Sequence, residues 1–175
     1  MPSLSYYILA RSAVVSDCGR YRYTLSRSFR DGDPGKRVAF VCLNPSTADA
    51  STDDPTTRRV CSFARAWGYQ GVDIVNLFAF RATDPRALFE LSLADAVGPL
   101  NDWHIDDIIS RASLVVAAWG AHGTHLDRAR KVLDRLTFKH RDVRALHTLS
   151  GGEPAHPLYL PADSVPRSYR GPHGG

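Results

Sequence analysis

The sequence predicts an α/β fold: a three-layer sandwich in which a four-stranded parallel sheet lies between helices, with an additional N-terminal antiparallel hairpin. Continuous apolar runs bounded by turn-forming residues are typical of strands buried on both faces. These runs alternate with segments of helical apolar spacing, and the order strand, helix, strand implies parallel pairing. A length of 175 residues with 43% hydrophobic residues suits one domain with one core.

We expect a single domain over residues 1–175, divided into three parts. Residues 1–36 alternate aromatic and polar side chains around a turn at residues 17–19, which predicts the antiparallel hairpin as an extension. Residues 37–161 hold the α/β core. Residues 162–175 are rich in Pro, Gly, Arg and Ser, which predicts a flexible tail.

Four apolar runs in the core predict the parallel strands. Turn formers bound the first run, and the others have the same buried character. In open sheets of this kind, ligands bind beyond the carboxyl ends of the strands, so polar residues just after each run are the first candidates for a site. The predicted strands are residues 38–43, 72–75, 114–118 and 143–149.

Helical spacing of apolar residues predicts three helices between these strands. The first begins at Pro55, because Asp54 is a suitable N-cap and proline is favoured at the first helical position. The second covers residues 100–112, and Asn101 at its start is interpreted as an N-cap. The third carries apolar residues from 126 to 136.

Several classes of protein are excluded by composition. No apolar run approaches the roughly 18 residues of a membrane span, and residues 1–15 lack the pattern of a signal peptide. We therefore expect a cytoplasmic monomer without a membrane partner. Cys18, Cys42 and Cys61 lie in unrelated contexts without metal-ligand spacing, so we expect no cofactor and no bound metal.

Two charge features are open to more than one interpretation. The net charge is +4, and the basic residues are nearly all arginine, which favours phosphate contacts with DNA or a nucleotide; a GC-rich genome explains the same bias. Asp49, Asp53 and Asp54 crowd one loop, where three carboxylates can bind a divalent metal. Helix capping and loop structure are the favoured explanation.

Hydrogen-bonding residues follow all four predicted strands. A lone asparagine after a strand is usually a turn former, but four such exits together favour a functional site. The residues are Asn44 after the first strand, Asn76 after the second, Trp119 and His122 after the third, and His156 after the fourth.

The order of these motifs resembles that of the uracil-DNA glycosylase superfamily. The matching segments are Leu-Asn-Pro-Ser-Thr at residues 43–47, Asn76 at a strand end, Val-Val-Ala-Ala-Trp-Gly-Ala-His at 115–122 and His-Pro-Leu at 156–158. They span about two thirds of the chain. The whole chain most closely resembles an uncharacterised bacterial and phage family, a domain of unknown function with the motifs Leu-Asn-Pro-Ser-Thr-Ala-Asp and Asp-Asp-Pro-Thr.

The glycosylase resemblance implies a role for each matching residue. Asn44 would position a water at the sugar carbon, and Asn76 would read the edge of an extruded pyrimidine. His156 would hydrogen-bond the oxygen of the leaving base, and Leu158 would be the apolar wedge that fills the gap left by a flipped base. Further expected substrate contacts are Pro45, Ser46 and Thr47 in the first loop, Phe78 stacking on a base, Arg81 at a phosphate, and Trp119 and His122.

The chain also departs from the superfamily pattern. Leu43 replaces the glycine before the Asn-Pro pair, the tyrosine that rejects thymine is absent, and the usual Ser-Pro continuation of the His-Pro loop is missing. An amide at Asn44 cannot accept a proton as a carboxylate does, so this site would orient water rather than deprotonate it. Substrate specificity does not carry over.

Three functions follow as hypotheses. The first is a glycosylase-like enzyme that hydrolyses the N-glycosidic bond of an unusual or damaged base in DNA or in a nucleotide. The second is a nucleotide- or nucleobase-binding protein of the same fold with a different reaction. The third is a non-catalytic DNA-binding module that uses the arginines. A fold hosts many chemistries, so the site has to decide among them.

Overall fold

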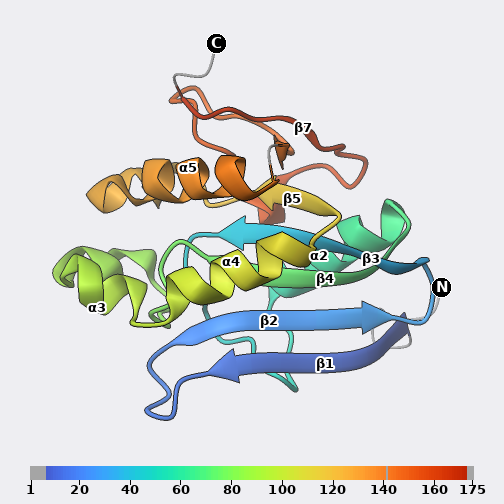
Figure 1. The fold of residues 1–175 in the computed structure, drawn as a ribbon, viewed down its shortest axis with the longest axis horizontal. Helices are drawn as coiled ribbons and strands as arrows, with labels where there is room; N and C mark the ends of the chain where they lie inside the picture. Colours follow the sequence, from blue (N-terminus) through green and yellow to red (C-terminus); the bar gives the residue numbers. More distant parts are fainter. Residues whose placement is uncertain (1–6, 141, 173–175) are drawn as a thin grey trace.

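The computed structural model describes residues 7–140 and 142–172. Within them, one mixed sheet has seven strands in the order β1-β2-β4-β3-β5-β6-β7 (Figure 1). The strands are β1 (Ile8–Val15), β2 (Arg22–Phe29), β3 (Asp33–Cys42), β4 (Tyr69–Asn76), β5 (Leu114–Ala117), β6 (Val143–Ala145) and β7 (Arg167–Ser168). The helices are α2 (Pro55–Ala66), α3 (Leu93–Val97), α4 (Asn101–Arg111) and α5 (Arg128–His140), with short 3₁₀ helices η1 (Pro85–Glu90), η2 (Ala121–Asp127) and η3 (Pro157–Tyr159).

The α/β class is confirmed, and the centre of the sheet is parallel. β3 pairs in parallel with β4 and with β5, and β5 pairs in parallel with β6. The predicted hairpin of β1 and β2 is present, but it is part of the same sheet, because β2 pairs antiparallel with β4. The first residues of β2 therefore lie at the edge where the parallel strands end.

The C-terminal segment differs from the prediction of a flexible tail over residues 162–175. Arg167 and Ser168 form β7, which pairs antiparallel with β6. Tyr169 is buried, and its hydroxyl donates a hydrogen bond to the Gly152 carbonyl at 3.1 Å. A two-residue strand and one buried tyrosine are too short to give a periodic signal, which is why composition alone suggested a tail. Residues 173–175 lie outside the described part.

Side chains of the central strands alternate between two hydrophobic clusters, one on each face of the sheet. In β4, Val72 and Ile74 pack with the apolar face of α2, whereas Val75 packs with α4 and α5 on the opposite face. The three layers are visible in Figure 1, where α4 crosses one face of the sheet and α2 lies behind it. No helix in the described residues is long and apolar enough to cross a membrane.

The N-cap predicted for α2 is confirmed, whereas the N-cap predicted for α4 is wrong, although α4 begins within one residue of the predicted start. Asp54 caps α2 by accepting a hydrogen bond from the Thr57 N–H at 2.7 Å. Asn101 is the first residue of α4 and makes no cap; its buried side chain instead donates to the backbone carbonyls of Asn76 and Leu77, at 2.9 and 3.2 Å. The sequence favoured a cap within the helix, but the side chain of Asn101 instead bonds to carbonyls that are distant in the sequence.

We predict that Asn101→Leu lowers the free energy of unfolding by about 2 kcal/mol, because two buried carbonyls lose a donor. Urea unfolding followed by circular dichroism measures it. The control is Ser110→Ala at the exposed end of α4, where the change stays within about 0.5 kcal/mol. An Asn101→Leu protein as stable as the control would show that these hydrogen bonds do not hold the exit of β4.

Candidate functional site

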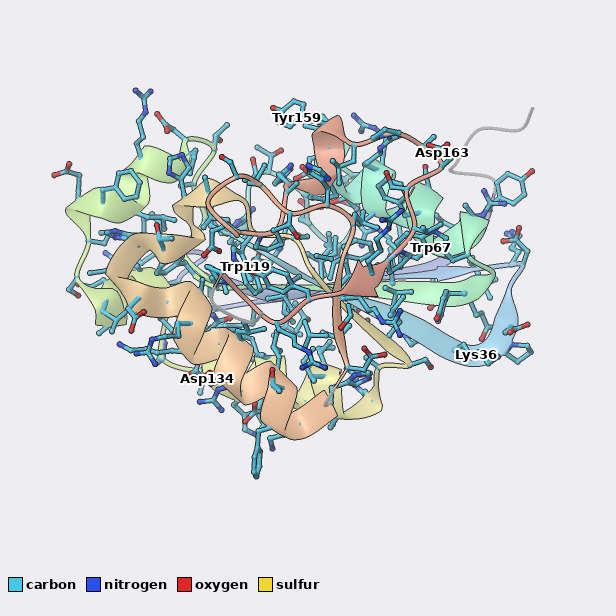
Figure 2. The ribbon with its side chains drawn as sticks, turned by 90° about the horizontal axis from the view of Figure 1, so that it is seen from above. Lys36, Trp67, Trp119, Asp134, Tyr159 and Asp163 are labelled. Atoms are coloured by element: carbon cyan, nitrogen blue, oxygen red, sulfur yellow. The ribbon has the colours of Figure 1, made fainter. Side chains whose placement is uncertain are left out.

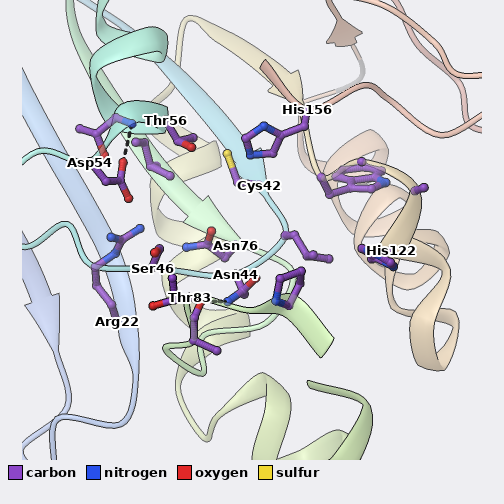
Figure 3. A pocket seen from close by; sticks show the side chains of 18 of the residues that line it. Arg22, Cys42, Asn44, Ser46, Asp54, Thr56, Asn76, Thr83, His122 and His156 are labelled. Atoms are coloured by element: carbon purple, nitrogen blue, oxygen red, sulfur yellow. Dashed lines mark hydrogen bonds between the residues drawn. The ribbon is translucent and has the colours of Figure 1, made fainter. Parts of the chain in front are cut away.

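A cavity of about 460 Å³ lies at the carboxyl ends of the parallel strands (Figure 3). The loops after β3, β4 and β5 line it, together with the N-terminus of α2, the start of β2 and the segment around His156. The side chains of Cys42 and Ile74 in its lining belong to the α2 face of the sheet. The cavity is therefore on that face, where strand-end sites are expected.

The structure brings together residues from four separate strand exits. Asn44 and Ser46 come from the loop after β3, and Asn76 is the last residue of β4. Trp119 and His122 follow β5, and His156 precedes η3. The predicted site residues that line the cavity are Asn44, Ser46, Asn76, Trp119, His122 and His156.

Five other predicted site residues are not among the lining residues. In the loop after β3, Pro45 is buried and Thr47 is exposed. Phe78 is fully buried in the cluster on the α4 face, because it leaves β4 toward the side opposite the cavity. Arg81 donates to the Gly19 carbonyl at 3.4 Å. The half-buried Leu158 uses its backbone N–H to donate to His156.

The exposed side chain of the His-Pro loop is Tyr159 rather than Leu158. Tyr159 lines the cavity and is 83% exposed. Figure 2 shows its ring projecting away from the body of the protein. Its ring centroid lies 6.0 Å from that of His156, so an aromatic surface stands beside the imidazole at the cavity.

Asn76 is the most unusual residue of the cavity. Its side chain is 1% exposed, yet neither the amide nitrogen nor the amide oxygen has a hydrogen-bond partner among the described residues. An unpaired buried polar group costs about 1–3 kcal/mol. The backbone of Asn76 is fixed from the other face, since its carbonyl accepts from Asn101. A rigidly held donor and acceptor thus face the cavity unpaired.

The amide nitrogen of Asn44 is engaged in hydrogen bonds within the loops. The nitrogen donates to the carbonyls of Pro45 and Ala82, at 3.1 and 2.8 Å, and so ties the exit of β3 to the exit of β4. What Asn44 can offer a ligand is its oxygen, an acceptor that cannot take up a proton at neutral pH.

The environment of His156 favours its neutral form. Burial lowers the pKa of His156, and the negative charge of Asp54 opposes this effect. The Nδ1 atom accepts a hydrogen bond from the Leu158 N–H at 3.3 Å. In the neutral ring the proton is therefore on Nε2, which makes that nitrogen a hydrogen-bond donor.

Sequence reasoning did not assign Arg22, Asp54, Thr56 or Tyr159 to the site, although all four line the cavity. Asp54 was interpreted as a helix cap, with metal binding as the alternative, and Thr56 only as a residue of the helix start. Arg22 belongs to the hairpin, which was treated as an extension, and its place depends on the pairing of β2 with β4. Only that long-range pairing could have revealed Arg22.

The acidic residues of the loop after β3 have separate tasks. Asp49 accepts from the Ser51 and Thr52 N–H groups, and Asp53 pairs with arginine side chains. Asp54 caps α2, as predicted. Across residues 7–140 and 142–172, no group of three or more His, Cys, Asp or Glu is placed to hold a metal ion.

The structure defines an α/β protein with a cavity, lined in part by amide and imidazole side chains, at the carboxyl edge of its parallel strands. The family model described as "Protein of unknown function (DUF1643)" matches residues 22–158, and the chain belongs to this family. No curated protein and no solved structure matches the chain. The matched region begins at Arg22 and ends two residues after His156, so it includes every residue of the cavity lining except Tyr159.

We predict that Asn76→Leu leaves the protein as stable as the wild type or raises its free energy of unfolding by up to about 1 kcal/mol, because it removes two unpaired buried polar atoms at similar volume. Urea unfolding measures it. Asn101→Leu is the matched control, since the same substitution there breaks hydrogen bonds. A loss of more than about 2 kcal/mol at position 76 would mean that the Asn76 amide has partners within the protein.

We predict that protonation of His156 destabilises the fold in acid. In the unfolded chain a histidine has a pKa of about 6.5; because the folded pKa is lower, stability is lost as the pH falls from about 6.5 through the folded value. His156→Asn keeps an acceptor for the Leu158 N–H. When the pH is lowered from about 7.5 to about 5, its melting temperature should fall less than that of the wild type.

The control for this pH measurement is the exposed residue His147, whose Asn variant should follow the wild-type curve. Burial also lowers the pKa of His104, but this contribution is common to all three proteins and cancels in the comparison. Identical pH curves for His156→Asn and the wild type would contradict the assignment.

Proposed function

We propose that the protein is a uracil-DNA-glycosylase-like enzyme that hydrolyses the N-glycosidic bond of an unusual or damaged base in DNA or in a nucleotide. One observation carries the proposal: the buried, unpaired amide of Asn76 lines the same cavity as the imidazole of His156. A buried polar group without a protein partner calls for an explanation, and a ligand that pairs with the amide supplies one.

The amide of Asn76 supplies one acceptor and a pair of donors. This pattern complements the edge of a pyrimidine, where a ring N–H lies beside a carbonyl oxygen. A base that lacks this edge would leave the amide unpaired, so Asn76 also supplies discrimination. The bracing of its backbone by Asn101 keeps the amide in position without reorganisation.

His156 suits the leaving base. Departure of a base as an anion places negative charge on its carbonyl oxygen, and a fixed donor stabilises that charge in a water-poor cavity. The neutral ring with its proton on Nε2 is such a donor, and the Leu158 N–H holds the ring in this tautomer. Burial of His156 strengthens the interaction because the local dielectric is low.

Asn44 and Tyr159 complete the proposed roles. The Asn44 oxygen can accept a hydrogen bond from a water and direct it at the sugar carbon, without removing its proton. This arrangement suits an oxocarbenium-like transition state, in which the base departs before water attacks. The exposed ring of Tyr159 provides a surface on which a neighbouring base can stack.

The fold adds support at the level of analogy. Parallel strands β3, β4, β5 and β6 present the Asn-Pro, Asn and His-Pro segments in the order found in the glycosylase superfamily. Fold analogy alone does not establish an activity, so the proposal rests on the cavity.

The test is incubation of the protein with oligonucleotides that carry uracil, hypoxanthine, xanthine or modified pyrimidines, with free base detected by mass spectrometry. We predict release of one base, and a loss of about a hundredfold in rate in Asn76→Leu and in His156→Ala. Asn44→Ala should lose less than His156→Ala, because it orients water without proton transfer.

The control for base release is Arg111→Gln on the exposed side of α4, far from the cavity lining. Equal rates in Asn76→Leu and Arg111→Gln would overturn the roles proposed for the cavity. Absence of release from every substrate, with a folded protein, would overturn the glycosylase proposal itself.

A second candidate is a nucleotide-binding protein of the same family with a different reaction. The observation that favours it is the engagement of the Asn44 nitrogen with the carbonyls of Pro45 and Ala82, since a residue used to close a loop contributes less to chemistry. Saturable thermal stabilisation by a mononucleotide, without base release, would favour this candidate.

A further inference from the structure

Arg22 differs from the other buried arginines of the protein. Arg27 is fully buried and pairs with Asp53 at 2.7 Å, and the 5% exposed Arg128 pairs with Asp102. Arg22 is 3% exposed, but it has no ion-pair partner among residues 7–140 and 142–172. Its Nη1 donates to the Ala48 carbonyl at 2.8 Å, and its buried Nε has no partner there.

The local geometry of the hairpin aims Arg22 into the cavity. The register between β1 and β2 shifts so that Val14 pairs with Thr24 and Val15 with Arg22, which leaves one extra residue in β2. Such a bulge changes which face a side chain takes. Tyr23 consequently packs on the side of α4, whereas Arg22 reaches the α2 side and lines the cavity.

The N-terminus of α2 lies on the same side of the cavity. Figure 3 shows the Arg22 guanidinium below Asp54, with Thr56 above it. Thr56 lines the cavity in the first turn of the helix, where backbone N–H groups and the helix dipole favour negative charge. A buried guanidinium that has no ion-pair partner among the described residues thus faces the cavity beside a helix N-terminus.

We propose that Arg22 and the first turn of α2 at Thr56 bind a phosphate group of the substrate. This inference rests on the proposed function, because it places the phosphate in the cavity that takes the base at Asn76. It names the substrate class: nucleotides or nucleotide residues of a strand, rather than free bases or nucleosides.

Charge balance supports an anion at this position. Burial lowers the pKa of Arg22 to about 10, and the negative charge of Asp54 opposes the shift. A buried cation without a partner is costly, and a phosphate oxygen restores the missing pair with charge-assisted hydrogen bonds. The charge of Asp54 is already stabilised by the Thr57 N–H and by the dipole of α2.

Asp54 also limits which phosphate binds. Among the described residues that line the cavity it is the only carboxylate, and it repels an anion held by Arg22. A singly charged phosphate suffers less from this repulsion than a doubly charged one. The phosphodiester of a strand and the 5′-phosphate of a free nucleotide share the required chemistry and differ in charge.

The experiment is isothermal titration of the full chain with inorganic phosphate at low ionic strength. We expect saturable binding that weakens at least about tenfold in Arg22→Gln and tightens a few-fold in Asp54→Asn, which keeps a helix cap but removes the repulsion. The matched control is Arg58→Gln: Arg58 is exposed in the same helical turn, does not line the cavity and should leave the affinity within about twofold.

Equal weakening in Arg22→Gln and Arg58→Gln would reduce the effect to general electrostatics and overturn the site, as would absence of phosphate binding by the wild type. If Arg22→Gln fails to fold, Arg22→Lys replaces it: lysine keeps the charge but has no Nε–H, and should still weaken binding. An Arg22→Lys protein with wild-type affinity would overturn the role of the guanidinium.

Titrations with three further ligands separate the sources of the phosphate. Thymidine 5′-monophosphate should bind more tightly than thymidine in the wild type but not in Arg22→Gln, and a thymidine dinucleotide tests the phosphodiester. Phosphate binding does not depend on turnover. If phosphate binding is absent but base is released, only this inference is overturned. If base release is absent but phosphate binds, only the glycosylase proposal is overturned.

Discussion

The site depends on how two backbone carbonyls are held at the end of β4. Asn101 donates to the carbonyls of Asn76 and Leu77, and Arg128 donates to Leu77 at 2.7 Å. Backbone carbonyls at a strand end that is buried in the core need such hydrogen-bond donors. Because Asn101 and Arg128 supply them from α4 and α5, β4 can end at Asn76 with its last carbonyls paired, beside the cavity that residues of four strand exits line.

The alternation of side chains across β4 separates stability from function. Val75 and Leu77 point into the cluster of α4 and α5, whereas Asn76, between them, faces the α2 side and the cavity. The α4 face, with its hydrophobic cluster and the hydrogen bonds from Asn101, therefore fixes the backbone of a residue whose own side chain has no partner among the described residues. Unpaired polar groups persist only where the surrounding packing determines the backbone so strongly.

Much of this arrangement follows from local sequence. The apolar runs gave the parallel strands, Asp54 and Pro55 gave the start of α2, and the rule of strand ends led to Asn44, Asn76 and His156. The rest depends on contacts between distant residues. A bulge and an antiparallel pairing place Arg22, a two-residue strand holds the tail, and Asn101 takes carbonyls 24 and 25 residues away instead of a local cap. None of these leaves a periodic trace in the sequence.

The groups that can give or take a proton in the cavity limit the reactions that can occur there. Nδ1 of His156 is used by the Leu158 N–H, and Asn44 has no titratable proton, so neither removes a proton from water at neutral pH. Asp54 is the one carboxylate in the described lining, and one of its oxygens caps α2. His122 is a further titratable group of the described lining. The proposed hydrolysis draws its rate from stabilising the departing base, with water attacking an already cationic sugar. A reaction that needs a base before bond cleavage would have to use His122 or the second oxygen of Asp54.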